Sequence, residues 1–289
     1  MGLFLVLTRM AEVIKHIIIG IVQGLTEFLP VSSTAHIRIV PALLGWDDPG
    51  AAVTAVTQLG TLAAVLLFFR KDLVQLGSAG VQSVVQFNMR NQWDERLKRD
   101  MRLAWFIVLG TLPIGVLGLA FKQTIETDFR SLELIAWSLI GLAILLGIAE
   151  VVAKHRRSME EMNFMDTQLI GLAQAVALIP GSSRSGTTIT AGLFLGLTRE
   201  AAARFSFLLS IPAVLASGLL ELKDLVKHGI GDAGLLNLFL ATAVAGIVGY
   251  ASIAFLLKWL QTRSTLVFIA YRIILGAVIM YLAREGIIQ

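Results

Sequence analysis

Residues 23–36 read QGLTEFLPVSSTAH, and residues 174–187 read QAVALIPGSSRSGT. Both stretches carry a Pro-x-Ser-Ser core, first at residues 30–33 and again 150 positions later at residues 180–183. Each core interrupts an apolar segment with hydroxyl groups, and the two stretches add a carboxylate, an imidazole and a guanidinium. Because such groups are costly to place inside a membrane, their presence indicates a functional site.

The composition indicates an integral membrane protein. Hydrophobic residues make up 56% of the 289 residues and charged residues only 15%, whereas an average soluble domain has about 25% charged residues. The chain has no Cys, which excludes disulfides and thiolate metal sites. The net charge of +4 is modest, and the basic residues cluster in loops, which favours membrane orientation over nucleic-acid binding.

Six apolar runs are each about long enough to cross a bilayer as a helix. Two other apolar segments, 13–44 and 168–197, are broken at the Pro-x-Ser-Ser cores into halves of roughly 10 to 17 residues, which is about 15 to 25 Å of helix. Each half reaches the bilayer midplane but hardly spans it, so both segments are predicted to be re-entrant helix–loop–helix hairpins. The six uninterrupted runs cover residues 51–69, 103–121, 132–153, 205–222, 236–257 and 265–283.

The order of these segments predicts an all-α integral membrane protein with an inverted-topology repeat. A re-entrant hairpin followed by three crossings occurs twice, at about residues 11–153 and 166–285, within one membrane domain of residues 1–289. Because three is odd, the second half enters from the opposite face and the two breaks meet near the midplane. Ala51-Ala52 and Ala201-Ala202 keep the 150-residue offset. The alternative is chance similarity among Ala-rich and Gly-rich helices.

The basic residues predict the orientation. One side receives most of the Lys and Arg residues, including Arg102, Arg157, Arg199 and Arg204, and the positive-inside rule assigns this side to the cytoplasm. Both termini then lie outside, the first hairpin enters from outside and the second from the cytoplasm. The loop of about residues 71–102 is the largest soluble piece, and its mixed charges indicate a solvated surface segment without chemistry.

The sequence GSSRSGTT at residues 181–188 has the chemistry of a phosphate-binding loop. Backbone amides at a helix start point at an anion, the helix dipole favours negative charge, and Arg184 adds a planar fork suited to phosphate oxygens. The Lys-Ser/Thr ending of a Walker loop is missing. The alternative is a helix break whose arginine satisfies carbonyl groups. The predicted substrate-binding residues are Ser182, Ser183, Ser185, Gly186, Thr187 and Thr188, with Ser32 and Thr34 from the first hairpin.

Glu27 is the candidate carboxylate of the first hairpin. Gln23 and Glu27 are one helical turn apart and share a face. A carboxylate at membrane depth is costly unless it is paired, protonated or bound to a cation. Glu27 can therefore ligate a hard divalent cation, orient His36 or pair with Arg184. Gln23 is a weaker ligand than a carboxylate, so the hairpin offers no strong two-carboxylate metal site.

Ser33 and His36 are the candidate nucleophile and base. They are three positions apart, and their side chains can approach one another if the second half-helix begins at Ser33 or Thr34. A hydroxyl, an imidazole and the carboxylate of Glu27 form a nucleophile set. A lone histidine on an apolar helix is ordinarily a satisfied core residue, but these neighbours favour a functional role.

Two further arginines are interpreted as structural. Arg38 lies two residues beyond His36 and either lines the same cavity or extends outward. Arg272, in the last span, is expected to pair with an acid such as Glu150 or Glu221.

At these residues the chain resembles the undecaprenyl-diphosphate phosphatase family, also called bacitracin-resistance proteins. The matching signatures are residues 23–36 and 180–188, with further similarity at 205–209 and at Tyr271-Arg272, so the resemblance covers essentially the whole chain. It implies a membrane phosphatase that converts undecaprenyl diphosphate to undecaprenyl phosphate and inorganic phosphate and so recycles the lipid carrier of cell-wall synthesis. It also implies a divalent cation, Mg²⁺ or Ca²⁺, and a pocket open to the outside of the bacterial cytoplasmic membrane.

The resemblance also assigns residues, and two positions depart from the family pattern. Many members have Glu where this chain has Gln23, which puts a metal role for that position in doubt, and Ala35 stands where Gly is common. The residues that match the two catalytic motifs are Glu27, Ser33 and His36 in the first, and Ser183, Arg184 and Thr188 in the second.

The expected mechanism has Ser33 attacking the terminal phosphorus, with His36 as base and Glu27 either orienting the imidazole or holding the ion. Alternatives are His36 as the nucleophile or as the base for direct attack by water. The rival class is a secondary transporter or lipid-carrier flippase, since inverted repeats and midplane anion sites are also transporter features. The sequence leaves the oligomeric state open, a homodimer included.

Overall fold

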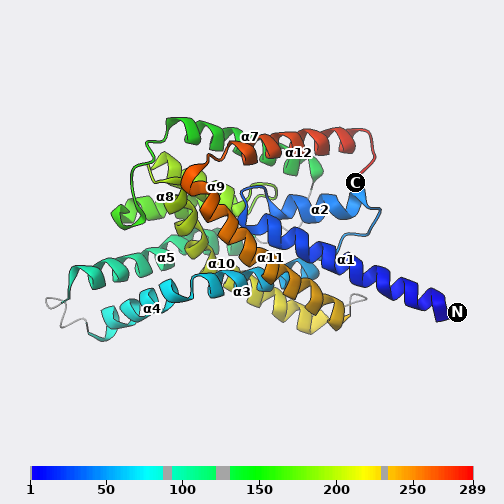
Figure 1. Cartoon of the computed structure of the whole chain (residues 1–289), viewed down its shortest axis with the longest axis horizontal. Coiled ribbons are helices and arrows are strands. Elements are labelled where there is room, and N and C mark those ends of the chain that lie inside the picture. The colour runs from blue at the N-terminus through cyan, green and yellow to red at the C-terminus, as the bar shows by residue number, and fades with distance from the viewer. Residues whose placement is uncertain (1, 87–92, 122–130, 229–233, 289) are drawn as a thin grey trace.

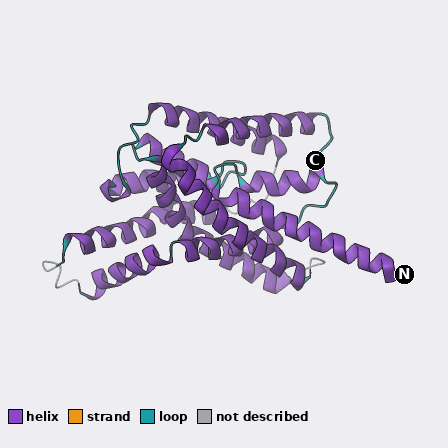
Figure 2. Ribbon diagram, in the orientation of Figure 1, coloured by secondary structure: helices purple, strands orange, loops and turns teal. Residues whose placement is uncertain are grey.

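The computed structural model describes residues 2–86, 93–121, 131–228 and 234–288. Within these ranges the regular elements are all helices (Figure 2). In chain order they are α1 (Gly2–Phe28), α2 (Ser33–Leu43), α3 (Gly50–Phe68), α4 (Arg70–Val85), α5 (Glu95–Ala120), α7 (Leu132–Val152), the short 3₁₀ helix η3 (Met159–Glu161), α8 (Phe164–Val176), α9 (Arg184–Phe194), α10 (Arg199–His228), α11 (Leu235–Thr262) and α12 (Leu266–Arg284).

The protein is a multi-pass membrane protein. Five described helices are long and apolar enough to cross a bilayer, namely α5, α7, the first 22 residues of α10, α11 and α12. The sixth predicted crossing corresponds to α3, a helix of 19 residues whose uninterrupted described apolar part is Val56–Phe68. Many large apolar side chains on these helices are exposed, as expected for surfaces that face lipid.

Two helix–loop–helix hairpins lie at the centre, with their breaks at the two predicted places, whereas their re-entrant path and the inverted repeat stay predictions. The pair α1–α2 approaches from the side of the N-terminus and the pair α8–α9 from the opposite side, and their loops meet in the middle (Figures 1 and 2). The partners of the hairpins correspond as well, because α1 packs on α11 and α8 packs on α5. That the two sides are opposite faces of a membrane stays a prediction.

The two hairpins have the same local geometry, but their offset is 151 and not 150. The second helix of each has 11 residues and begins after a serine with a positive φ, 75° at Ser32 and 67° at Ser183. Each serine side chain accepts a hydrogen bond from the amide three positions on, at Ala35 and Gly186. The Pro-x-Ser-Ser cores align one residue out of register because the second loop has one more residue, Gly181, between its proline and its cap.

The helix ends agree with the 151-residue offset. Gly45 and Gly196 end α2 and α9 with φ values of 67° and 83°, a left-handed conformation that favours glycine. In this register Ser33 corresponds to Arg184, and His36 corresponds to Thr187. The two hairpins therefore share a backbone geometry but have different side chains at corresponding positions.

Two expectations about helix lengths are wrong. The first arm of the first hairpin is α1, a helix of 27 residues that begins at Gly2 rather than near residue 13. Residues 71–102, predicted to be a solvated loop, are largely helical, since α4 covers their first part and α5 begins at Glu95. The mixed charges of this segment gave no sign that α4 has a buried face, which includes Leu76 and Ala79. The helix α4 packs against α5.

Segments whose basic residues assigned them to the same side of the membrane contact one another in the structure. The Nη2 of Arg102 on α5 donates to the carbonyl of Glu160 in η3 at 2.9 Å, and Arg204 on α10 pairs with Asp72 on α4 at 3.0 Å. Each contact joins two elements that are far apart in the sequence.

Gly60 lies where helices α3 and α11 pack closely against each other. A Cβ added at Gly60 on α3 would lie 2.0 Å from the carbonyl oxygen of Thr242 on α11. Because that oxygen is backbone, Gly60→Ala has to push the helices apart and should destabilise the protein by about 1–3 kcal/mol or more. The measurement is thermal unfolding of the purified protein in detergent.

The matched control is Gly77→Ala in α4, where nothing lies within 4 Å of an added Cβ. This change should leave stability unaltered or raise it by about 0.5–1 kcal/mol through helix propensity. Equal melting temperatures for the two variants would contradict the close α3–α11 contact.

Candidate functional site

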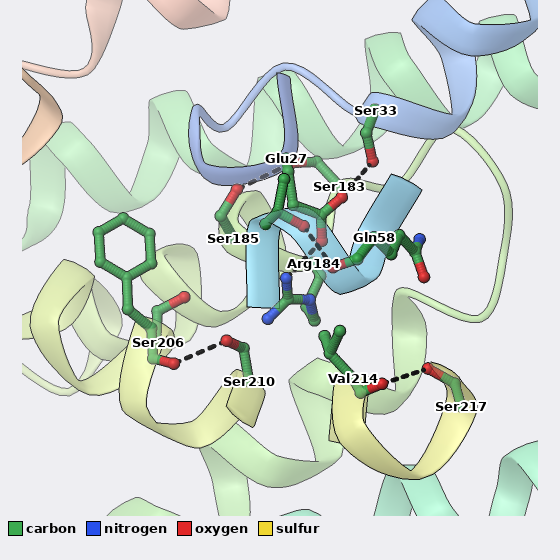
Figure 3. Close-up of polar contacts among 12 residues, drawn as sticks. Glu27, Ser33, Gln58, Ser183, Arg184, Ser185, Ser206, Ser210, Val214 and Ser217 are labelled. Atoms are coloured by element: carbon green, nitrogen blue, oxygen red, sulfur yellow. Dashed lines mark hydrogen bonds and ion pairs between the residues drawn. The ribbon is translucent and has the colours of Figure 1, made fainter. Parts of the chain in front are cut away.

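An ion pair between the two hairpins forms the centre of the site. Glu27 lies at the end of α1 and Arg184 is the first residue of α9, and the Arg184 Nη2 donates to the Glu27 Oε1 at 2.5 Å (Figure 3). The side chains are 6% and 14% exposed, respectively. A single buried charge of either kind is costly, so each group stabilises the other. Of the three roles considered for Glu27, namely binding a cation, orienting His36 and pairing with Arg184, the structure shows the pairing with Arg184.

The second oxygen of Glu27 is also occupied. Its Oε2 accepts hydrogen bonds from the Gln23 Nε2 at 3.0 Å and from the Ser33 Oγ at 2.8 Å. Ser33, the first residue of α2, therefore directs its proton at a carboxylate. Gln23 holds the same carboxylate in place, while its own Oε1 is buried without a hydrogen-bond partner.

The hairpin loops exchange two further hydrogen bonds. The Gly181 amide donates to the Thr34 Oγ1 at 3.2 Å, and the Ser185 Oγ donates to the Leu29 carbonyl at 3.1 Å. Thr34 and Ser185 occupy equivalent positions in their hairpins. Each loop thus satisfies a backbone group of the other, where the helices are broken and water is scarce.

His36 is held in a different arrangement from the one the spacing suggested. Its Nδ1 lies 2.7 Å from the Ser32 carbonyl oxygen, and its Nε2 lies 2.6 Å from the Tyr271 hydroxyl on α12. Because a carbonyl only accepts, Nδ1 carries a hydrogen, and when the ring is neutral its Nε2 accepts from the Tyr271 hydroxyl. The expectation that His36 contacts Ser33 and is oriented by Glu27 is therefore wrong in this structure.

The geometry of α2 explains the difference. The His36 ring bonds back to the carbonyl four residues earlier and stacks on Tyr271, with the ring planes 6° apart. Ser33 points instead to the end of α1. The two side chains share a helix but contact different neighbours.

The hydroxyls of the second hairpin are mostly engaged within α9. Thr187 and Thr188 both donate to the Arg184 carbonyl, at 3.0 and 2.8 Å, and Thr188 also contacts the Ser206 Oγ on α10 at 2.6 Å. Ser183 caps the helix, as described above. The Ser182 Oγ is buried and has no partner.

Three residues near the site were missed or interpreted differently from the sequence. Tyr271, Ser206 and Arg272 lie in apolar spans, and the only signal for them was the family resemblance at 205–209 and 271–272. The expectation that Arg272 pairs with Glu150 is wrong. Glu150 instead pairs with Arg199 and accepts a hydrogen bond from the Thr265 hydroxyl. The Glu221 side chain lies outside the described residues.

Arg38 lies on α2, two residues beyond His36. Its guanidinium pairs with Asp48 in the segment after α2. This position agrees with the interpretation of Arg38 as a structural, outward-reaching side chain.

The donor set does not fit a resident divalent cation. No group of three or more His, Cys, Asp or Glu side chains gathers in the parts of the chain that the structure describes. Both oxygens of Glu27 are hydrogen-bonded to other side chains, and Gln23 offers one unengaged amide oxygen. Mg²⁺ keeps several water ligands but is usually held by one or two carboxylates, and the one carboxylate of this site is already engaged by Arg184, Gln23 and Ser33.

Residues 16–278 match the family model described as bacitracin resistance protein BacA. The chain belongs to this family. An undecaprenyl-diphosphatase of Chlorobium chlorochromatii is 55% identical and one of Chloroherpeton thalassium is 53% identical, each over 284 residues, 95% of this chain and 98% of the relative. An undecaprenyl-diphosphatase of Myxococcus xanthus is 51% identical over 275 residues, 95% of this chain and 90% of the relative.

The ion pair can be tested through its effect on stability. Glu27→Gln and Arg184→Met each leave the opposite charge buried without its partner, and each should destabilise the protein by about 3–5 kcal/mol. The double variant should lose much less unfolding free energy than the two single variants lose in total. Unfolding in detergent of all four proteins gives the coupling energy.

The control cycle uses Lys98 and Glu95 on α5, an exposed pair with a distance of 2.8 Å. Their coupling should be below about 1 kcal/mol because solvent screens exposed charges. A coupling of similar size in both cycles would rule out a special contribution of the buried pair.

Proposed function

We propose that this protein is a membrane phosphatase that hydrolyses undecaprenyl diphosphate to undecaprenyl phosphate and inorganic phosphate. The reaction recycles the lipid carrier of cell-wall synthesis. Membership of the BacA family and identities of 51–55% to relatives named undecaprenyl-diphosphatase support this function. One structural observation carries the proposal: a single hydrogen-bonded group holds the Ser33 hydroxyl, the Glu27 carboxylate and the Arg184 guanidinium.

The diphosphate binds at the start of α9. The first amides of a helix have no partner within it and favour an anion, together with the helix dipole. The Gly186 amide is already taken by the Ser183 Oγ, which leaves those of Arg184 and Ser185. The Arg184 guanidinium adds two-pronged hydrogen bonding to phosphate oxygens.

Ser33 is the nucleophile of the proposed reaction. Its Oγ attacks the terminal phosphorus, a serine–phosphate bond forms, the anhydride bond breaks, and polyprenyl phosphate leaves. The proton of Ser33 passes to the Glu27 Oε2, to which it already donates. Glu27 thus takes the role of base that the sequence suggested for His36, while Arg184 stabilises the charge on the transferred phosphoryl group.

His36 acts in the second step of the proposal. Water hydrolyses the phosphoserine and releases inorganic phosphate, and the neutral His36 Nε2 accepts the proton of that water. Because the Tyr271 hydroxyl occupies the Nε2 in the substrate-free protein, this step requires that hydroxyl to move aside for the attacking water or to pass the proton of the water on to Nε2. The alternatives with His36 as the nucleophile, or as the base for direct attack on the diphosphate, are decided by whether phosphate becomes bound to Ser33.

A divalent cation is a separate part of the proposal. Since the protein donors do not fit a resident ion, we propose that Mg²⁺ or Ca²⁺ arrives with the phosphate oxygens of the substrate. EDTA should then lower turnover without changing the stability of the substrate-free protein.

The cellular setting follows from the proposed substrate. The protein lies in the bacterial cytoplasmic membrane, with its site open to the outer side and the basic segments in the cytoplasm. A homodimer is compatible with this arrangement. The transporter alternative is not favoured, because transport requires no nucleophile and the relatives are named as diphosphatases.

Phosphate release from a polyprenyl diphosphate in detergent tests the function. The wild type should release phosphate without a membrane gradient, whereas Ser33→Ala, His36→Ala and Arg184→Ala should each lower kcat at least about 10²-fold. Mass spectrometry of quenched His36→Ala should show phosphate on Ser33, because its hydrolysis is slowed.

His16→Ala is the matched control, since His16 is also a buried histidine, on α1, with its ring bonded to the Glu12 carbonyl. It should turn over substrate at about the wild-type rate. Near-normal turnover in both His36→Ala and Arg184→Ala would exclude the proposed site, and a wild type without phosphate release would favour the transporter.

A further inference from the structure

Arg272 on α12 is a fully buried arginine. Its side chain is 0% exposed, and it is the largest such side chain in the described residues. A buried guanidinium is costly unless a negative charge or a full set of hydrogen bonds compensates it. Among the described residues, Arg272 has neither.

The hydrogen bonds of Arg272 involve one of its three nitrogens. Nη2 donates to the carbonyls of Ser182 at 3.0 Å, Gly181 at 3.3 Å and Ser138 at 3.4 Å. Nε and Nη1 are buried and have no hydrogen-bond partner in the part of the chain that the structure describes. Since a guanidinium has five N–H groups, the one on Nε and the two on Nη1 are unused. None of the ion pairs found among the described residues includes Arg272.

The unused face of Arg272 lies against the start of α9. A Cβ built on Gly186 would be 2.6 Å from the Arg272 Nη1 and 3.1 Å from the Ser183 Oγ. Gly186, in the first turn of α9, is therefore small enough to let the guanidinium approach. A helix start carries partial positive charge, so a cation there is repelled unless an anion joins the two.

The charges of the site point to the same conclusion. Glu27 is balanced by Arg184, which leaves the charge of Arg272 without a counterpart among these residues. Ser182, whose carbonyl accepts from Arg272, also has a buried hydroxyl without a partner. Unused donors and an unbalanced positive charge beside a helix start are the chemistry of an anion-binding site.

We propose that Arg272 is a second phosphate-binding cation of this site, so that Arg184 and Arg272 each bind one phosphate group of the diphosphate. The assignment rests on the proposed function for the identity of the substrate. Arg184 shares its charge with Glu27, where the reacting phosphoryl group is expected, and Arg272 binds the phosphate that stays on the lipid. Two cations favour a diphosphate over a monophosphate, which is the difference between the proposed substrate and its lipid product.

The experiment measures anion binding without turnover. Inorganic pyrophosphate is the probe, and its dissociation constant is taken from the rise in melting temperature of the detergent-purified protein. Arg272→Met should weaken pyrophosphate binding at least about tenfold, because a charged hydrogen-bond donor is lost. Arg272→Lys keeps the charge but loses the fork and should fall between wild type and Arg272→Met.

Arg284→Met is the matched control, since Arg284 is an exposed arginine at the end of the same helix. It removes the same charge and should leave pyrophosphate binding unchanged. If Arg272→Met does not fold, Gly186→Ala replaces it, because the added methyl displaces the Nη1 and should weaken binding in the same direction.

The alternative is that Arg272 only holds the loop carbonyls in place. In that case Arg272→Met lowers the melting temperature but keeps the wild-type affinity for pyrophosphate, and this outcome overturns the proposal. Phosphate release by the wild type is scored separately. If the wild type releases no phosphate, the proposed function fails, while the pyrophosphate affinities still decide the role of Arg272.

Discussion

Two broken helices inside an apolar environment have to satisfy their backbone groups without water, and the hairpins of this protein satisfy each other. The Gly181 amide uses the hydroxyl of Thr34, and the Leu29 carbonyl uses that of Ser185. The Glu27–Arg184 ion pair closes the same junction. Because neither hairpin can complete these contacts alone, the requirement to bury the breaks also assembles the site.

The two hairpins share a backbone geometry but differ in chemistry. With the offset of 151, a hydroxyl at Ser33 corresponds to the guanidinium of Arg184, and the imidazole of His36 corresponds to the hydroxyl of Thr187. In the proposed mechanism the first hairpin supplies the groups that move protons, and the second supplies positive charge and helix amides. A phosphoryl transfer needs both kinds of group at one point, and a pair of helices meeting head to head provides them.

The sequence predicted the hairpins because Pro, Gly and Ser interrupt apolar segments too short to span twice. It did not predict the register, since one additional residue at Gly181 moves the helix start without changing the Pro-x-Ser-Ser motif. The helix α4 was missed for a related reason: its mixed charges looked solvated, although Leu76 and Ala79 are buried and α4 packs against α5. A local sequence pattern reflects the residue types of one segment. The register of a hairpin and the buried face of a helix depend on the segment that packs against it.

The sequence by itself determined the membrane class, the two breaks and the residue types of the site, because an ionised group in an apolar segment is rarely accidental. The tertiary structure decided the partners. It directs Ser33 to Glu27 rather than to His36, and it places Tyr271 against the imidazole. Residues from separate helices become neighbours only when the helices pack, and spacing along one helix cannot specify which distant side chain reaches a buried polar atom.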